Sequence, residues 1–119
     1  MFGKANPYNL DCPSRDFLAL AGGKWTVLLL CALRDGPMRT GDLKRKVGGI
    51  SQKMLVQTLK ALHFNGLVER TSYGEVPPRV EYRLTTLGHS LSDLAAGIEQ
   101  WVVSNYPEIL KHRESGRWD

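Results

Sequence analysis

The apolar period of the chain changes at Gly66, and this change limits the folds that are open to it. Upstream of Gly66 the apolar residues recur at the spacing of helices, whereas LVERTSY (67–73) and VEYRLT (80–85) alternate apolar and polar residues. The intervening GEVPPR (74–79) is typical of a hairpin loop, and helical spacing returns from about Thr86. The sequence therefore predicts a mainly α-helical fold with one small β-hairpin.

Two helices are expected in the N-terminal third of the chain. Asp11 is placed to cap the first, with Pro13 in its first turn, and Gly22 and Gly23 are expected to end it. The following run KWTVLLLCAL (24–33) is nearly all apolar, so a helix here must be covered on most of its sides. We expect this segment to be the central core helix.

Two further helices and a tight turn precede the hairpin. Thr40 is expected to cap a helix through residues 41–47, and the glycine pair at 48–49 is expected to end it. The next helix is expected to begin at Ser51 and to end near Asn65. Two short helices joined by a glycine-containing turn and followed by a hairpin form the winged helix-turn-helix pattern.

The last helix is expected at about residues 86–106, because Pro107 is unfavourable inside a helix. Its apolar residues share one stripe: Leu91, Leu94, Ala95, Ile98, Trp101 and Val102. We therefore divide the chain into a flexible arm (1–10), a single domain (11–106) that includes this helix, and a C-terminal tail (107–119).

The helix predicted from Ser51 has one apolar face and one basic face. At about 100° per residue, Leu55, Leu59 and Leu62 fall within one narrow arc and are expected to face the core. The opposite face carries hydrogen-bonding and cationic side chains and no carboxylate: Ser51, Gln52, Lys53, Gln57 and Lys60, with Val56 beside them. Gln and Lys can bond to base edges, and a Ser at a helix N-terminus can hold a phosphate, so this face suits the DNA major groove. A solvated face without a ligand is the alternative.

Basic residues on the neighbouring elements favour DNA binding over that alternative. Lys44, Arg45 and Lys46 belong to the preceding helix, and Arg39 is counted with them as a DNA contact. Arg79 is expected at the tip of the hairpin, where a wing can enter the minor groove. The net charge of +4 and the pI near 9.3 add a modest preference for anionic partners. Double-stranded DNA is therefore the expected partner.

The sequence contains no constellation of residues for catalysis or metal binding. The segment AGGKWT (21–26) has a Trp where a phosphate-binding loop needs Ser or Thr, and the three histidines are isolated. We expect no enzyme activity, no cofactor and no metal site, with His63 and His89 at the surface. The longest apolar run is far shorter than the roughly 20 residues of a membrane span, and no secretory signal is visible, so a cytoplasmic protein is expected.

The two cysteines differ in their sequence surroundings. Cys31 lies within LLLCAL and is expected to be a small buried apolar residue. Cys12 lies at the expected start of a helix beside the arm, where the helix dipole lowers a thiol pKa and where Lys4 or Arg15 could assist. Cys12 can be either a reactive thiol or a half-buried contact residue, and the sequence leaves both interpretations open.

Taken together, the motifs resemble those of the HxlR family of bacterial winged helix-turn-helix regulators, which are distant relatives of the MarR type. The similarity covers most of residues 12–102, in the right order, through these stretches: Cys12-Pro13, GGKWTVLLL (22–30), GDL (41–43), GISQKMLVQTLKAL (49–62), GLVER (66–70) and YGEVPPRVEYRLTTLG (73–88). The resemblance implies a homodimer, held by N- and C-terminal helices, that binds a pseudo-palindromic operator.

Several further expectations depend on this resemblance. The exposed part of the stripe on the last helix becomes the expected dimer interface: Leu91, Leu94, Ile98, Trp101 and Val102. Cys12 matches a position at which several family members respond to oxidants or electrophiles, so such a small molecule is a candidate signal. Repression is the commoner outcome for small regulators of this kind. The alternative is a winged-helix module that binds proteins, or DNA non-specifically, without thiol sensing.

Overall fold

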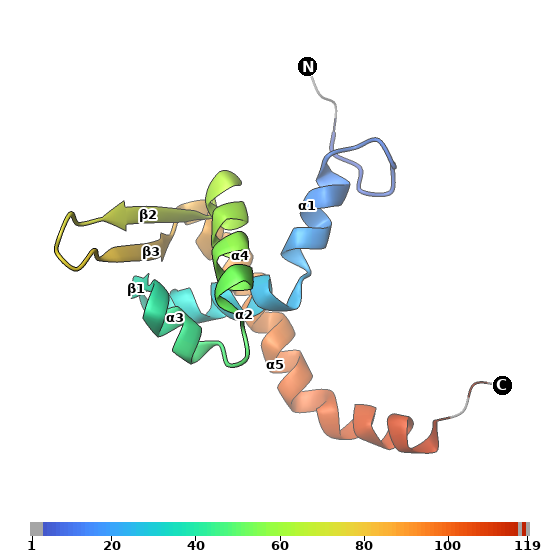
Figure 1. Cartoon of the computed structure of the whole chain (residues 1–119). Coiled ribbons are helices and arrows are strands. Elements are labelled where there is room, and N and C mark those ends of the chain that lie inside the picture. Colours follow the sequence, from blue (N-terminus) through green and yellow to red (C-terminus); the bar gives the residue numbers. More distant parts are fainter. Residues whose placement is uncertain (1–3, 117, 119) are drawn as a thin grey trace.

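The computed structural model describes residues 4–116 and 118 of the 119-residue chain. In this part of the chain, helices dominate and a small antiparallel sheet projects from them (Figure 1). The elements follow in the order α1 (Ser14–Ala21), α2 (Lys24–Ala32), a 3-10 turn η1 (Leu33–Asp35), β1 (Met38–Arg39), α3 (Thr40–Lys46), α4 (Gln52–Phe64), β2 (Val68–Ser72), β3 (Val80–Leu84) and α5 (Thr86–Ser115). The prediction of a mainly α-helical fold with a hairpin is confirmed.

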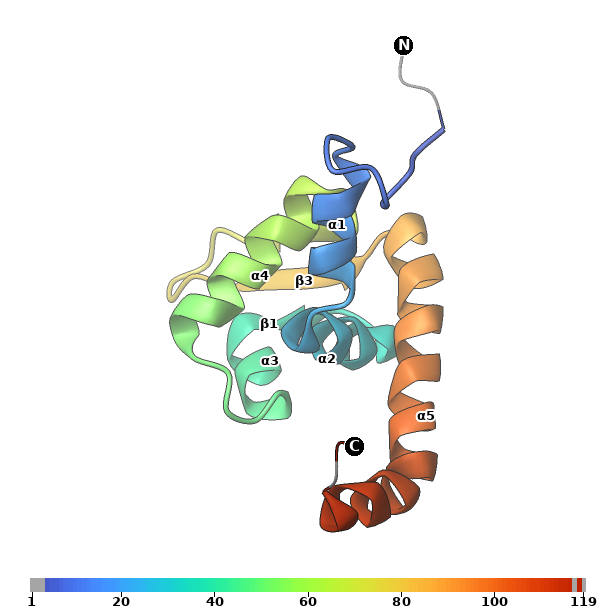
Figure 2. The same ribbon diagram turned by 90° about the vertical axis from the view of Figure 1, so that its right-hand side faces the viewer.

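The central helix α2 is surrounded by α1, α4 and α5. Leu29 and Leu30 of α2 and Leu33 of η1 are fully buried, and they join the apolar side chains of α3, α4 and the sheet in a single core. Burial of such leucines contributes about 1.5–3 kcal/mol each, so the near-continuous apolar run explains why this segment is the centre of the fold. Figure 2 shows α5 on one side of α2 and α4 on the other.

The helix-turn-helix consists of α3, a turn and α4. Gly49 has a φ of 84°, a left-handed conformation that glycine adopts without strain, and this residue lets the chain reverse between the two helices. Ser51 caps α4, because its hydroxyl accepts a hydrogen bond of 3.0 Å from the backbone N–H of Met54. Asn65 occupies the C-cap position, so the predicted start and end of α4 are both confirmed.

The expected cap of α3 is wrong by one residue. Arg39 occupies the N-cap position with an extended backbone, and Thr40 is the first helical residue. The cause is a third strand that the sequence analysis missed, since β1 pairs with β3 and holds Arg39 extended. Two residues are too short to show a strand period, which explains why β1 was not predicted.

The sheet has the strand order β1-β3-β2, and its two faces differ in charge. Cα partners in antiparallel strands project to the same side, and successive residues alternate between sides. The register therefore assigns these residues to the face that packs toward α4: Met38, Val68, Arg70, Ser72, Val80, Tyr82 and Leu84. The outer face carries Arg39, Glu69, Thr71, Glu81 and Arg83.

The start of α1 differs from the prediction. Pro13 occupies the N-cap position and Ser14 is the first helical residue, so Asp11 does not cap the helix. The backbone N–H of Asp11 instead donates to the side-chain oxygen of Asn9, within a set of turns between residues 6 and 12. Pro13 cannot donate a backbone hydrogen bond, which makes it suitable for this boundary. Residues 1–3 of the expected arm lie outside the described residues.

Helix α5 is longer than predicted. It continues through Pro107 to Ser115, so residues 107–115 of the expected tail are helical. Figures 1 and 2 show the helix changing direction toward its C-terminal end. Proline removes one backbone hydrogen bond and bends a helix without having to end it. A side-chain hydrogen bond spans Pro107, since Arg113 donates to the Tyr106 hydroxyl at 3.0 Å.

None of the described helices is by itself long and apolar enough to cross a membrane. The segments 14–21 and 24–35 reach that length and hydropathy only as a pair, and they are bent by 66° relative to each other.

Candidate nucleic-acid interface

Helix α4 has the two faces that its sequence predicts. Leu55, Leu59 and Leu62 are buried in the core, which confirms the inward apolar arc. The polar residues of the opposite face are exposed, and Val56 is half-buried beside them: Ser51, Gln52, Lys53, Gln57 and Lys60. No carboxylate lies on α4. The helix therefore presents amide and ammonium groups with no acidic neighbour on the same element.

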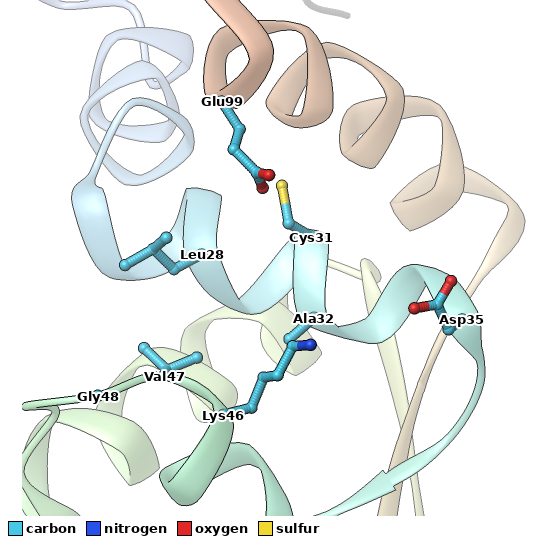
Figure 3. Close-up of a pocket in the computed structure, with 8 residues that line it drawn as sticks. All are labelled: Leu28, Cys31, Ala32, Asp35, Lys46, Val47, Gly48 and Glu99. Carbon is cyan, nitrogen blue, oxygen red and sulfur yellow. The ribbon is translucent and has the colours of Figure 1, made fainter. Parts of the chain in front are cut away.

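The three cations expected on α3 do not share one surface. Arg45 forms an ion pair with Asp42 of the same helix, which balances its charge. Lys46 is exposed, and its side chain extends toward Ala32 of α2 (Figure 3). Lys44 is exposed and has no ion pair among residues 4–116 and 118. Lys44 and Lys46 thus both keep an exposed charge without an ion pair in the described part of the chain.

Arg79 does not lie at the tip of the wing. It lies at the end of the loop next to β3, only 28% exposed, and its guanidinium stacks on the Tyr73 ring at 3.9 Å. Its Nη1 lies 3.7 Å from a Glu75 carboxylate oxygen and its Nε lies 3.5 Å from Glu81. The two carboxylates balance its charge, so the main role of Arg79 is to stabilise the conformation of the wing loop.

The side of the sheet that each arginine occupies follows from the strand register. Arg39, which pairs with Glu81, projects from the outer face and is exposed. Arg70, which pairs with Tyr82, projects toward α4 and was not predicted as a site residue. The sequence contains the signal for it, because Val68 is buried and the residue two positions later must lie on the same face. Alternation along β2 could therefore have identified Arg70.

Cys12 lies in a small hydrogen-bonded loop. Its Sγ lies 3.0 Å from the Ser14 hydroxyl oxygen and accepts a hydrogen bond of 3.4 Å from the backbone N–H of Asn6. These bonds, that of Ser14 first, lower the pKa of the Cys12 thiol because they stabilise the thiolate. Lys4 and Arg15, which could have assisted if they lay nearby, are not among the groups that lower this pKa.

Cys31 is half-buried rather than fully buried as expected. It lines a cavity of about 340 Å³ between α2, the end of α3 and α5, and Figure 3 shows its thiol and the Glu99 carboxylate pointing toward each other. Burial, followed by the interaction with Glu99, raises the pKa of the Cys31 thiol to about 11. Cys31 therefore stays protonated at neutral pH.

The apolar stripe on α5 divides into two parts. Ala95 is buried against the core. The predicted interface residues face outward, with Leu94 67%, Ile98 51%, Trp101 58% and Val102 43% exposed, while Leu91 is half-buried. Soluble monomers rarely expose this much contiguous apolar surface on one helix.

The histidines occupy unrelated positions. His63 is exposed on α4 and His89 is exposed on α5, which confirms the expected surface placement of both. Among residues 4–116 and 118, no group of three or more His, Cys, Asp or Glu side chains could hold a metal ion.

Comparison with known proteins identifies the family. A family model for the HxlR-like helix-turn-helix matches residues 20–109. The chain belongs to the HxlR-like helix-turn-helix family. Members are transcriptional regulators that bind DNA through this motif, and the winged helix-turn-helix prediction is confirmed.

Individual members of the HxlR-like family extend this result. The chain is 45% identical over 111 residues to the HTH-type transcriptional regulator YtfH of Escherichia coli K12, covering 93% of this chain and 88% of YtfH. It is 48% identical to the transcriptional regulator ytfH from Salmonella typhimurium, whose structure matches with a TM-score of 0.90 over 93% of this chain and 99% of that one. The redox regulator HypR in its oxidized form matches at 37% identity with a TM-score of 0.72, covering 79% and 97%.

Proposed function

We propose that this chain acts in the cytoplasm as a homodimer that recognises a pseudo-palindromic operator and represses transcription. The observation that carries the proposal is the exposed, carboxylate-free face of α4, the second helix of the helix-turn-helix. Titration of the protein into a fluorescent duplex of random sequence tests whether it binds DNA. Saturable binding that weakens with salt is expected, and no binding even at low salt would contradict it.

Each exposed residue of this face has a proposed role. Lys53 and Gln57 bond to base edges in the major groove, since an amide or ammonium group can pair with purine acceptors there. Ser51 and Gln52 at the start of the helix assist this reading, with Val56 in apolar contact. Lys60, together with Lys44 on α3, binds phosphates and fixes the register of the helix on DNA. Arg39 adds a backbone contact from the outer face of the sheet, whereas Arg79 maintains the shape of the wing.

The proposed dimer uses the exposed stripe of α5. In a two-fold interface each residue occurs twice, so a charge introduced at Ile98 places two charges in one apolar contact. We expect Ile98→Glu to produce monomers in sedimentation velocity and to lose cooperative operator binding. Glu108→Gln, a change on the same helix, serves as a control that retains the dimer. A dimer of unchanged affinity in Ile98→Glu would exclude this interface.

We also propose that Cys12 senses oxidants or electrophiles. HypR, a relative of similar fold, is a redox regulator. The Ser14 and Asn6 hydrogen bonds that lower the pKa of Cys12 increase the fraction of the reactive thiolate near neutral pH. Modification at the start of α1 would act on the dimer and change the spacing of the two α4 helices.

The difference between the two thiols gives a direct prediction. Cys12 is expected to react with iodoacetamide at a lower pH than Cys31. Hydrogen bonds stabilise the Cys12 thiolate, whereas the pKa of the Cys31 thiol is raised to about 11. Ser14→Ala is expected to shift the midpoint of the Cys12 rate profile to higher pH, since it removes the main hydrogen bond to the thiolate. Mass spectrometry of each alkylated peptide provides the rates.

Two controls define this measurement. Cys31→Ser should leave the Cys12 profile unchanged. Faster alkylation of Cys31 than of Cys12, or an unchanged midpoint in Ser14→Ala, would contradict the proposed activation of Cys12.

A further inference from the structure

A cleft of about 420 Å³ separates α4 from the face of the sheet that carries Arg70. It runs along one side of α4 and is bounded by β2 and β3 on the other. The polar side chains in its walls are those of Thr40, Gln52, Lys60, His63, Arg70 and Tyr82. The hydroxyl, amide, ammonium, imidazole and guanidinium groups in this set can all donate hydrogen bonds.

The charges in this cleft are of one sign. Lys60 and His63 enter it from α4, and Arg70 enters it from β2, and all three are exposed. The cleft is lined by no carboxylate, and neither Lys60 nor Arg70 forms an ion pair within the described part of the chain. The acidic residues of the two strands, Glu69 and Glu81, lie on the outer face of the sheet.

The position of the cleft matches the path of a DNA strand. The exposed face of α4 is proposed to lie in the major groove, and the wing extends beside it (Figure 1). A phosphodiester backbone separates a major groove from the adjacent minor groove, so one strand must pass between the helix and the wing. A groove with cationic walls and no carboxylate is complementary to that strand.

We propose that this cleft holds one backbone strand of the bound duplex, with Lys60 and Arg70 on its phosphates, and that His63 joins them as an imidazolium. The inference rests on the proposed DNA binding by α4 and adds two residues to it. An imidazole gains a second N–H donor and a positive charge when it takes up a proton in mildly acidic solution. The proton comes from the buffer, so DNA binding is coupled to proton uptake at His63.

The salt dependence of binding tests the role of Arg70. With a random-sequence duplex, Arg70→Ala is expected to weaken binding severalfold and to reduce the slope of log affinity on log salt by about one unit. Arg70→Lys should retain the slope, because the charge remains. Lys111→Ala removes an exposed cation from the C-terminal part of α5, outside the cleft and the proposed DNA surface, and should leave the slope unchanged. An unchanged slope in Arg70→Ala would overturn the assignment.

The pH dependence of binding tests His63. Affinity of the wild type is expected to fall severalfold between about pH 6 and pH 8, and His63→Gln should flatten this dependence. His89→Gln removes an exposed histidine that lies outside the cleft and should retain it. A pH dependence that is identical in the wild type and His63→Gln would overturn the proton coupling.

Disproof of the cleft assignment and disproof of the proposed DNA binding give different results. A wild-type protein that binds duplex DNA while Arg70→Ala and His63→Gln bind identically excludes the cleft alone. A wild-type protein that binds no duplex at low salt excludes the proposed function and the cleft together.

Discussion

Gly88→Ala is expected to lower the free energy of unfolding by about 3 kcal/mol or to prevent folding, because it forces an atom into occupied space. A Cβ at this position would lie 1.9 Å from the backbone oxygen of Leu67 and 3.0 Å from its carbonyl carbon. That oxygen accepts a hydrogen bond of 3.1 Å from the N–H of Thr85. The clash therefore also strains the cap through which α5 joins the wing.

Urea denaturation followed by circular dichroism measures this effect. Gly97→Ala is the matched control on the same helix, since nothing lies within 4 Å of its added Cβ. It should stabilise the protein by about 0.5–1 kcal/mol, because alanine favours a helix more than glycine does. Equal stability of Gly88→Ala and the wild type would contradict the close packing of α5 on Leu67.

Gln57→Ala is expected to relax sequence preference at one base pair of each half-site, at a cost of about 1–3 kcal/mol on the specific operator. The side chain lies on the exposed face of α4, and its amide can make two hydrogen bonds to an adenine edge. Its loss should leave binding to random DNA nearly unchanged, because the phosphate contacts remain.

Lys60→Ala is the matched control for Gln57→Ala, since both residues are exposed on α4. It should weaken binding to all sequences alike and reduce the salt slope by about one unit. Competition of labelled operator with unlabelled variant duplexes separates the two behaviours. If Gln57→Ala lost the same affinity for operator and for random DNA, its base-reading role would be excluded.

The helices that carry the interface could be predicted because local signals agree along them. In α4 the arc of Leu55, Leu59 and Leu62 sets the buried side, and Ser51 at the cap fixes the first turn. The exposed polar face follows from the buried one. The hairpin could be predicted as well, because two segments with strand alternation flank the loop GEVPPR.

The features that escaped prediction depend on contacts between elements. Arg79 was expected to be free for DNA, but the closing of the loop brings it onto Tyr73 between Glu75 and Glu81. The strand β1 exists only through its pairing with β3. Pro107 predicts a helix end in the sequence, although in the structure α5 continues through it to Ser115.

The environment of Cys12 escaped prediction for a similar reason. The groups that lower the pKa of its thiol are a hydroxyl two residues ahead and a backbone N–H six residues behind. The second of these reaches the sulfur only because hydrogen-bonded turns fold residues 6–12 back toward the helix. Sequence proximity to a helix end did not reveal this arrangement.

Selection from a randomised duplex pool by the reduced protein, at about 150 mM salt, tests the central claim most directly. Enrichment of an inverted repeat whose half-site centres lie about 10 base pairs apart, or a multiple of that spacing, is the predicted result. Recovery of unrelated sequences with only salt-sensitive binding would contradict it, and would favour a module that binds DNA non-specifically or binds an acidic protein.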